Sequence, residues 1–296
     1  MFLIVGGDSE IGAATARAIM AQGKAVAATT RRPERVAPGR PLLDLAAPLE
    51  GWEPPQGTRA ACVCAAIARI TDCAADPPGT ARINVGQTLT LVERLLARDI
   101  YVLFLSTNQV FDGRMPHAPA DTPHSPVSEY GRQKARTEAA LLGLMARGAP
   151  VAILRLAKVV SPGMPLIASW IGNLSAGRPI RAFADMTLAP APIQLVSAAI
   201  ASLLEERARG VFQLTGPRDV AYADMGRFLA DHLGASPTLV EATSAREAGL
   251  PEGSTPLNTT LDSSLLRERY GLQASDVWDV VERVVAHALA ESERVD

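Results

Sequence analysis

The first half of the chain alternates short, continuous apolar runs with segments in which apolar residues recur at helical spacing. The apolar runs predict six strands, Phe2–Gly7, Ala25–Thr30, Arg40–Leu45, Ala60–Ala66, Tyr101–Thr107 and Pro150–Leu156. The segments between them predict helices over Ile11–Gln22, Ala81–Arg98 and Glu129–Arg147. Apolar strands separated by helices are typical of a parallel sheet with both faces covered. We therefore expect an α/β fold with a doubly wound, Rossmann-type parallel sheet, which binds ligands beyond the carboxyl ends of its strands.

The regular alternation of predicted strands and helices ends after Val160, where the stretch Ser161–Pro165 breaks the pattern. Beyond it the pattern predicts two helices and a strand, over Leu166–Ala176, Leu195–Arg207 and Val211–Thr215. We expect residues 1–160 to form a nucleotide-binding domain and residues 161–296 a smaller C-terminal substrate-binding lobe. Residues 190–215 are expected to pack back on the first domain.

Composition narrows the class of protein. The chain has 296 residues, 48% of them hydrophobic, and a net charge of −2, which is a globular mixture with enough apolar residues for a sizeable core. It has no basic stripe for nucleic acid and no apolar run of about 18 residues for a membrane span. No signal peptide is recognised, so we expect a cytoplasmic protein. Its cysteines, Cys62, Cys64 and Cys73, are an odd number without a nearby histidine, and we expect reduced thiols and no metal site.

A glycine-containing turn, GGDSEIG, runs from Gly6 to Gly12 between the first strand and the first helix. Free N–H groups at a helix N-terminus bind phosphate, so this turn is a candidate site for a dinucleotide's pyrophosphate. Gly6 would permit the tight turn and Gly12 the close approach of the helix. Ser9 stands where the motif has its middle glycine, and its hydroxyl could also donate to phosphate. A strand–turn–helix junction with glycines only for packing is the alternative.

The second predicted strand ends in TTRRPE, with Arg31 and Arg32 where an NAD site usually places an acid. Guanidinium groups suit the 2′-phosphate of NADP, because they form forked, charge-assisted hydrogen bonds. We therefore predict NADP(H), with NAD(H) as the less favoured cofactor. Two solvated surface arginines are the alternative. Asp44 could accept from the adenine amino group or cap the next turn.

Tyr130 and Lys134 stand one helical turn apart in SEYGRQKARTE. Residues four apart share a helix face, and a neighbouring ammonium lowers the pKa of a phenol. Such a pair can supply a general acid or base to a carbonyl or an alcohol, and the lysine can also hold the nicotinamide ribose. Thr107 ends a strand upstream and could hydrogen-bond the substrate oxygen. The alternatives are an ordinary helix-face Tyr with a solvated Lys, and a Thr that bonds its own backbone.

These motifs together carry a resemblance to a known family. GGDSEIG, INVGQTLTLVERL, FLSTNQVFDG, SEYGRQKARTE and ILRLAKVVSPG follow one another as in extended short-chain dehydrogenases/reductases. Within them, STNQVFDG, FADMTLAPAP and TPLNTTLDSSLLRERYGL resemble segments of the dTDP-4-dehydrorhamnose reductase family. The similarity covers nearly the whole chain. It departs from the family after the catalytic Thr, where Asn108-Gln109 replaces Asp-Tyr, and at other sugar-side positions that have become less polar.

The resemblance implies an NADPH-dependent reductase of a keto group on a nucleotide sugar, with Thr107, Tyr130 and Lys134 as the catalytic residues. A homodimer is left open. The predicted cofactor-binding residues are Gly6, Ser9, Glu10, Ile11, Gly12, Arg31, Arg32, Asp44, Leu45, Ala65, Ala66, Ser106, Tyr130 and Lys134. The alternatives are an epimerase or dehydratase of the same superfamily, which usually holds NAD, and a non-catalytic NADP-binding regulatory protein.

Four other side chains receive structural interpretations. We expect His117 and His124 to be surface-loop residues, although either could reach the cleft. Arg155, at the end of the sixth predicted strand, is expected to form a buried structural pair. Trp170 is expected to pack in a core, with the substrate as its alternative neighbour.

Overall fold

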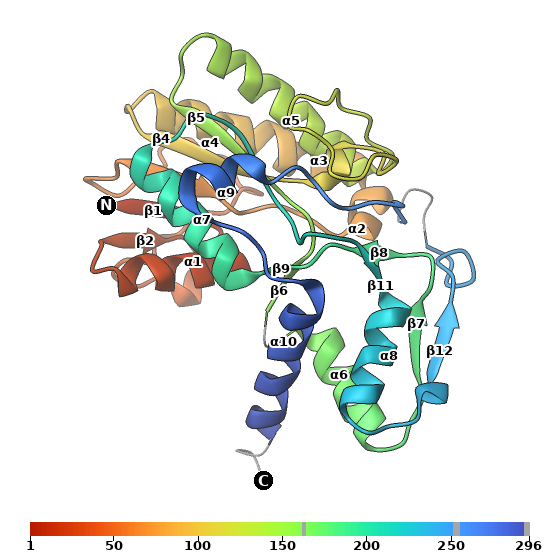
Figure 1. Ribbon diagram of the computed structural model, residues 1–296. Helices are drawn as coiled ribbons and strands as arrows, with labels where there is room; N and C mark the ends of the chain where they lie inside the picture. Colours follow the sequence, from red (N-terminus) through yellow and green to blue (C-terminus); the bar gives the residue numbers. More distant parts are fainter. Residues whose placement is uncertain (162–163, 251–254, 293–296) are drawn as a thin grey trace.

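The computed structural model describes residues 1–161, 164–250 and 255–292. At its centre is a six-stranded sheet in the order β10-β5-β4-β3-β1-β2, and each neighbouring pair is parallel (Figure 1). The strands are β1 (Phe2–Val5), β2 (Val26–Ala28), β3 (Ala60–Val63), β4 (Tyr101–Thr107), β5 (Val151–Leu156) and β10 (Gly210–Leu214). The predicted Rossmann-type, doubly wound α/β fold is confirmed.

Helices cover both faces of the sheet, which is why most residues of its strands are apolar. One face packs against α1 (Glu10–Ala21), α7 (Ile193–Glu206) and α9 (Ser264–Tyr270). The opposite face packs against α4 (Thr88–Leu96) and α5 (Glu129–Ala146). Alternate residues of β4 enter the two cores: Leu103 lies in the first and Phe104 in the second, and both are fully buried.

The predicted strand over Arg40–Leu45 is wrong. The segment follows the end of β2 through single hydrogen bonds, from Ala28 N to Gly39 O and from Thr30 N to Pro41 O, without forming a ladder. Gly39 has φ +74° and Pro41 has no N–H to donate, so a regular strand cannot form here.

The helix predicted over Ala81–Arg98 is part of a longer, irregular helical segment. It consists of α2 (Ile70–Ala75), α3 (Pro77–Ala81), a π-helix (Arg82–Gln87) and α4. Asp76 caps α3 by accepting from Gly79 N at 2.9 Å, and prolines occupy the first helical positions after it. Short 3-10 helices cover Pro33–Arg35, Asn108–Val110 and Pro237–Leu239.

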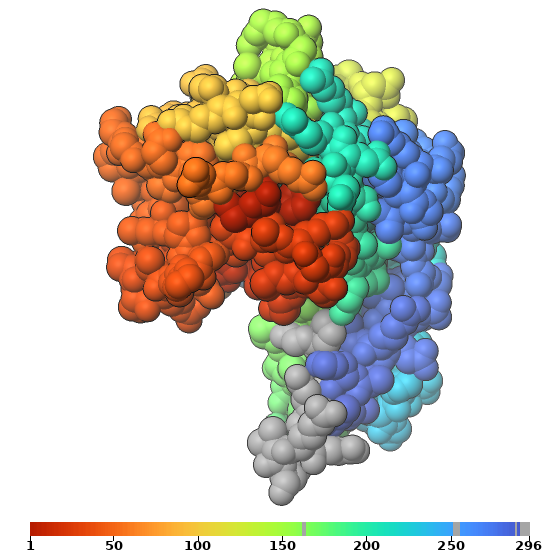
Figure 2. Space-filling model, turned by 90° about the vertical axis from the view of Figure 1, so that its left-hand side faces the viewer, coloured from red at the N-terminus to blue at the C-terminus, as the bar shows by residue number. Residues whose placement is uncertain are grey.

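The second lobe has its own core and hangs below the sheet in Figure 1, where α6, α8, β7 and β12 form its outer part. In Figure 2 the N-terminal half gathers in the upper body and the C-terminal helix extends downward. The lobe consists of β6 (Val159–Val160), α6 (Pro165–Ser175), β7 (Ile180–Phe183), β8 (Thr187–Leu188), β9 (Ala191–Pro192), β11 (Val220–Ala221), α8 (Tyr222–His232), β12 (Val240–Thr243) and α10 (Val277–Ser292). Trp170 is 5% exposed inside this core, as its packing interpretation expected.

Although α7 and β10 follow the second lobe's first elements in sequence, they lie with the first sheet. The boundary at residue 160 stays a prediction, and residues 162–163 of the predicted break lie outside the described residues. None of the described helices combines the length and apolarity that a membrane span requires.

Candidate active site

The first helix starts at a turn whose residues are locked to one another. Ser9 caps α1: its Oγ accepts from Gly12 N at 3.1 Å and donates to Gly6 O at 2.7 Å. Gly6 has φ +90°, and a Cβ on Gly12 would lie 2.3 Å from Gly6 O. The Ser9 hydroxyl donates within the turn in this structure, and its donation to a phosphate stays a prediction. The turn leaves the backbone N–H groups of Glu10 and Ile11, at the start of α1, for an anion.

A cavity of about 290 Å³ opens beside this turn, at the carboxyl ends of β1, β2 and β3. Eight of the predicted cofactor-binding residues line it: Gly6, Ser9, Arg31, Arg32, Asp44, Leu45, Ala65 and Ala66. Asp44 also caps its own turn by accepting from Ala46 N at 2.9 Å, so the alternative interpretation of its carboxylate holds as well. A cavity at a phosphate-binding turn with arginines at its mouth fits the adenosine end of a nicotinamide dinucleotide.

Two predicted cofactor-binding residues turn their side chains elsewhere. Glu10 accepts from Ser161 Oγ and lines a separate cavity between α1 and α7, and Ile11 packs against the sheet core. Because Glu10 and Ile11 begin α1, their backbone N–H groups could still contact a phosphate, whereas their side chains could not. Ser106 is buried on β4, 6% exposed, and does not line the cavity.

Thr107 ends β4 and begins the 3-10 helix that follows. Its Oγ1 accepts from Gln109 N at 3.2 Å and donates to Asn108 Oδ1 at 3.3 Å. Thr107 therefore bonds the nearby backbone, which is the alternative to a substrate contact. Its side chain nevertheless lies at the carboxyl end of the sheet. It is 7% exposed.

The first turn of α5 is pressed against that 3-10 helix. Ser128 caps α5 by accepting from Gly131 N at 3.0 Å and donates to Gln109 Oε1 at 2.7 Å. A Cβ on Gly131 would lie 2.1 Å from Gln109 O. This contact holds Tyr130 close to the end of β4. Sequence reasoning missed Ser128 and Gly131, although a serine three residues before a glycine marks the start of both α1 and α5.

Tyr130 and Lys134 lie together in the interior beside the end of β4. The Lys134 ammonium nitrogen lies 6.0 Å from the centre of the Tyr130 ring and 4.3 Å from that of Phe104. It donates to Leu105 O at 2.8 Å. The two residues are 9% and 3% exposed, so neither is the solvated helix-face residue of the alternative interpretation.

The electrostatics of the pair differ from the expectation. Burial raises the pKa of the Tyr130 phenol well above its usual range, and the neighbouring lysine does not bring it down. Burial also lowers the pKa of Lys134 to about 8, against the opposing pull of Glu138. The phenol therefore keeps its proton near neutral pH, while most of the lysine is charged.

Asn84, in the π-helix, joins one residue that lines the cavity to α5. Its side chain accepts from Ile67 N at 2.8 Å and donates to Ile67 O at 2.9 Å and to Gln133 Oε1 at 2.8 Å. Ile67 lines the cavity, and Gln133 lies next to Lys134 in sequence. π-Helical turns are frequent at functional sites, and here the turn places a fully buried amide between the two halves of the site.

A buried ion pair closes the far side of α5. Arg155 on β5 donates to both carboxylate oxygens of Glu138, and its guanidinium stacks 4.9 Å from the ring centre of Phe111. His124 lies 2.8 Å from Glu138 and its side chain is only 20% exposed, so its interpretation as a surface-loop residue is wrong. Burial would raise the pKa of Glu138, but hydrogen bonds from His124 and Arg155 lower it. The structural role expected for Arg155 is observed.

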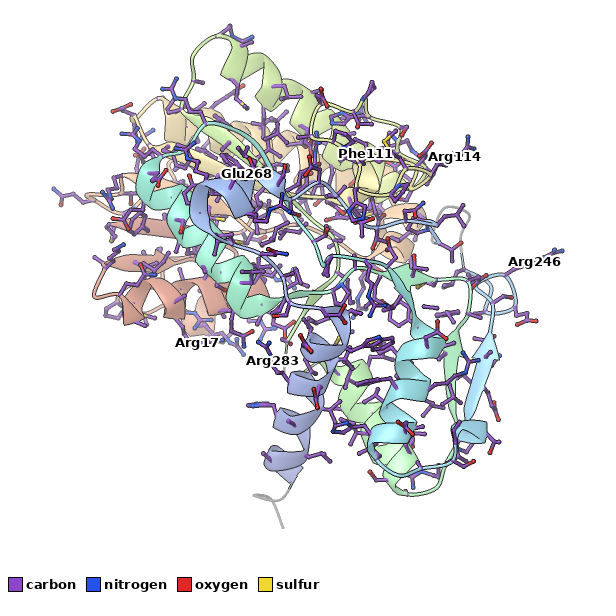
Figure 3. The ribbon with its side chains drawn as sticks, in the orientation of Figure 1. Arg17, Phe111, Arg114, Arg246, Glu268 and Arg283 are labelled. Atoms are coloured by element: carbon purple, nitrogen blue, oxygen red, sulfur yellow. The ribbon has the colours of Figure 1, made fainter. Side chains whose placement is uncertain are left out.

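The cluster anchors the loop that follows β4. In Figure 3 this loop carries Phe111 and Arg114, and Arg114 points outward from it. Arg155 donates to Ala120 O at 2.8 Å, and Gln213 on β10 donates to Ala118 O at 2.8 Å. His117 is exposed on the same loop, as expected. Among the described residues, no group of three His, Cys, Asp or Glu could hold a metal ion.

Comparison with known proteins identifies relatives over nearly the whole chain. The sequence model of the family described as RmlD substrate binding domain matches residues 1–290. The dTDP-4-keto-6-deoxy-D-glucose reductase of Streptomyces niveus is 28% identical over 219 residues, which cover 73% of this chain and 70% of that protein.

Two solved structures share the fold at low sequence identity. The dTDP-4-dehydrorhamnose reductase of Bacillus anthracis, in complex with NADP, has a TM-score of 0.78 and 15% identity, and covers 96% of this chain and 97% of that one. The UDP-glucose 4-epimerase of Thermus thermophilus, in complex with NAD, has a TM-score of 0.79 and 20% identity, and covers 97% and 98%. The fold alone thus separates neither reductases from epimerases nor NADP from NAD.

The contact between Gly131 and Gln109 O can be tested by adding one methyl group. We expect Gly131→Ala to lower the free energy of unfolding by about 1–3 kcal/mol, because the new Cβ must push α5 away from the 3-10 helix that follows β4. Gly143→Ala in the same helix is the control, since its Cβ meets only the end of the Arg147 side chain at 3.6 Å. Urea unfolding of both variants measures the difference. Equal effects would show that α5 does not depend on this close approach.

Lys134 is expected to reduce the stability of the fold that holds it. Its pKa is about 8 in the folded protein against 10.5 in its ordinary state, so below pH 8 the folded state carries a buried charge that the unfolded state solvates. We expect Lys134→Met to raise the free energy of unfolding by about 1–3 kcal/mol at pH 7. The gain should fade between pH 8 and 10.5, where the folded and then the unfolded lysine loses its proton. Denaturant unfolding of both proteins between pH 7 and 10.5 measures this gain in stability. A gain that does not change with pH would contradict the lowered pKa of Lys134.

Proposed function

We propose, since the chain belongs to the RmlD substrate binding domain family, that it is an NADP(H)-dependent reductase of a keto group on a nucleotide sugar. Membership of this family confirms the resemblance to extended short-chain dehydrogenases/reductases and the expectation of an oxidoreductase. The observation that carries the proposal is the burial of Tyr130 and Lys134 together beside the end of β4. Neither residue lines the cavity suited to a dinucleotide, but β4 is the neighbour of β3, whose carboxyl end does.

The residues divide the work of a carbonyl reduction. The bound nicotinamide cofactor supplies the hydride. Tyr130 gives its proton to the carbonyl oxygen as negative charge develops there, and a phenol whose pKa is raised by burial holds that proton until it is needed. Lys134 is charged near neutral pH, which suits a hydrogen bond to the cofactor's ribose. The Thr107 hydroxyl orients the carbonyl.

The substrate class follows from the relatives and is part of the proposal. The Streptomyces relative is named for a dTDP-4-keto sugar, and a nucleotide sugar with a 4-keto group is the substrate we propose here. The sugar-side positions, where Asn108-Gln109 replaces the acid and tyrosine of the resembled family, are less polar in this chain. We therefore expect a sugar with fewer polar contacts at that position than the family's usual substrate.

Removal of one oxygen tests the role of the phenol. We expect Tyr130→Phe to lower kcat/KM for nucleotide 4-keto sugars by about 10²–10⁴-fold, because the general acid is lost while the ring remains. NADPH oxidation followed by absorbance measures the rate, and titration with NADPH should show an unchanged Kd. Tyr222→Phe, at a tyrosine in the second lobe, is the control. Full turnover in Tyr130→Phe would contradict the mechanism, and cofactor binding without any turnover of the wild type would favour the regulatory alternative.

Substitution of the two arginines that line the cavity tests the preference for NADPH over NADH. The guanidinium groups of Arg31 and Arg32 have no ion-pair partner in the part of the chain that the structure describes, and both line the cavity. We expect the double change of Arg31 and Arg32 to alanine to weaken NADPH binding by about 10–100-fold, since charge-assisted contacts to a phosphate are lost. NADH binding should change little. Tighter binding of NADH than of NADPH by the wild type would instead favour the epimerase or dehydratase alternative.

A further inference from the structure

An acid stands inside the phosphate-binding turn and reaches the end of the second strand. Asp8 follows Gly7 in the turn, lines the cofactor cavity and has a side chain that is 17% exposed. Its carboxylate accepts from the Thr30 hydroxyl at 2.7 Å and from Arg31 N at 3.3 Å. It also accepts from the Arg40 guanidinium. Thr30 and Arg31 follow β2, so the carboxylate lies where NAD-dependent Rossmann folds hold the ribose of adenosine.

The donors that Asp8 uses are those that a 2′-phosphate requires. A hydroxyl, a backbone N–H and a guanidinium converge on one anion, which is the donor set of a phosphate site. Burial opposes the charge of Asp8, but the hydrogen bonds from Thr30 and Arg40 outweigh it and lower the pKa of the carboxyl. A bound 2′-phosphate would therefore share its donors with a second negative charge. A free 2′-hydroxyl could instead donate to that charge.

Arg40 is placed by the backbone that sequence analysis took for a strand. The hydrogen bonds from Ala28 N to Gly39 O at 2.9 Å and from Thr30 N to Pro41 O at 3.0 Å fix the segment on both sides of it. The Nε of Arg40 is buried and has no partner among the described residues, so one of its donors is still available. Arg35 adds a second cation 3.6 Å from the same Asp8 oxygen.

We propose that Asp8 and Arg40 are the specificity-determining pair for the cofactor: the Asp8 carboxylate favours a free ribose 2′-hydroxyl and opposes a 2′-phosphate, and Arg40 offsets it in favour of the phosphate. This proposal rests on the proposed function, because it assumes that a nicotinamide dinucleotide occupies the cavity. Arg31, Arg32, Arg35 and Arg40 outnumber Asp8, so NADPH is preferred in the wild type. The preference for NADPH over NADH is smaller than the arginines alone would give, because Asp8 opposes the 2′-phosphate.

The test compares four full-length proteins by fluorescence titration with NADPH and with NADH: the wild type, Asp8→Asn, Arg40→Gln and Glu34→Gln. Glu34 is an exposed acid in the neighbouring 3-10 helix that does not line the cavity, so its variant removes the same charge from a nearby site. We expect Asp8→Asn to tighten NADPH about tenfold and to weaken NADH about threefold. Arg40→Gln should weaken NADPH about tenfold, and Glu34→Gln should change either Kd less than about twofold.

The outcomes separate this inference from the function on which it rests. Weaker NADPH binding by Asp8→Asn would overturn it, because Asp8 would then only position Arg40. Equal effects of Asp8→Asn and Glu34→Gln would also overturn it, because only the total charge would matter. Binding of neither cofactor by the wild type would contradict the proposed function itself. Thermal unfolding confirms that each variant is folded, and Asp8→Ser replaces Asp8→Asn if the latter is not.

Discussion

The candidate site is arranged around an ammonium group that is buried beside the end of a parallel strand. Lys134 is 3% exposed, and it has no ion pair with a carboxylate in the described part of the chain. Its contacts are the Leu105 carbonyl and the face of the Phe104 ring. Glu138, one helical turn further on, is already bound by Arg155 and His124 and acts on Lys134 only from a distance. The charge is thus held beside Tyr130 without an ion-pair partner, which reduces stability and would suit the catalytic role that we propose for the pair.

Two helix starts share one construction and place the two halves of the site. At α1 and at α5 a serine caps the helix and accepts from the N–H of a glycine three residues later. In each case a Cβ on that glycine would collide with a carbonyl oxygen, of Gly6 or of Gln109. Since β1 and β4 run parallel in one sheet, both helix starts lie at the same edge of it. The turn at the start of α1 and the phenol of Tyr130 therefore lie at the same edge of the sheet, and each position depends on a glycine without a Cβ.

The sequence was sufficient for the parts of the fold that periodicity determines. Continuous apolar strands separated by helices predicted the parallel sheet, which the structure confirms. The strand prediction for Arg40–Leu45 was wrong because its two adjacent leucines resemble a short apolar strand. The positive φ of Gly39 and the missing N–H of Pro41 prevent regular pairing with β2. The two-residue strands of the second lobe carry too few residues for a period-two pattern.

The missed site residues depend on contacts between distant segments. Asp8 occupies a spacer position of a motif, and its significance comes from Arg40, 32 residues away. His124 looked like a loop residue because its partners, Glu138 and Arg155, lie on a helix and a strand. The pKa of Tyr130 was expected to be lowered by Lys134, but burial of the phenol raises it. Spacing along a helix identifies neighbours, but it does not reveal the dielectric around them.

Net transfer of hydride to a sugar carbon is the central claim, and isotope transfer tests it most directly. The full-length protein would be incubated with NADPH deuterated at C4 of the nicotinamide and with a nucleotide 4-keto sugar, and the sugar product would be analysed by mass spectrometry. The account predicts one deuterium in the product for each NADPH consumed. A sugar product that forms without deuterium and without NADPH consumption would contradict it, because an epimerase or dehydratase recycles its cofactor instead.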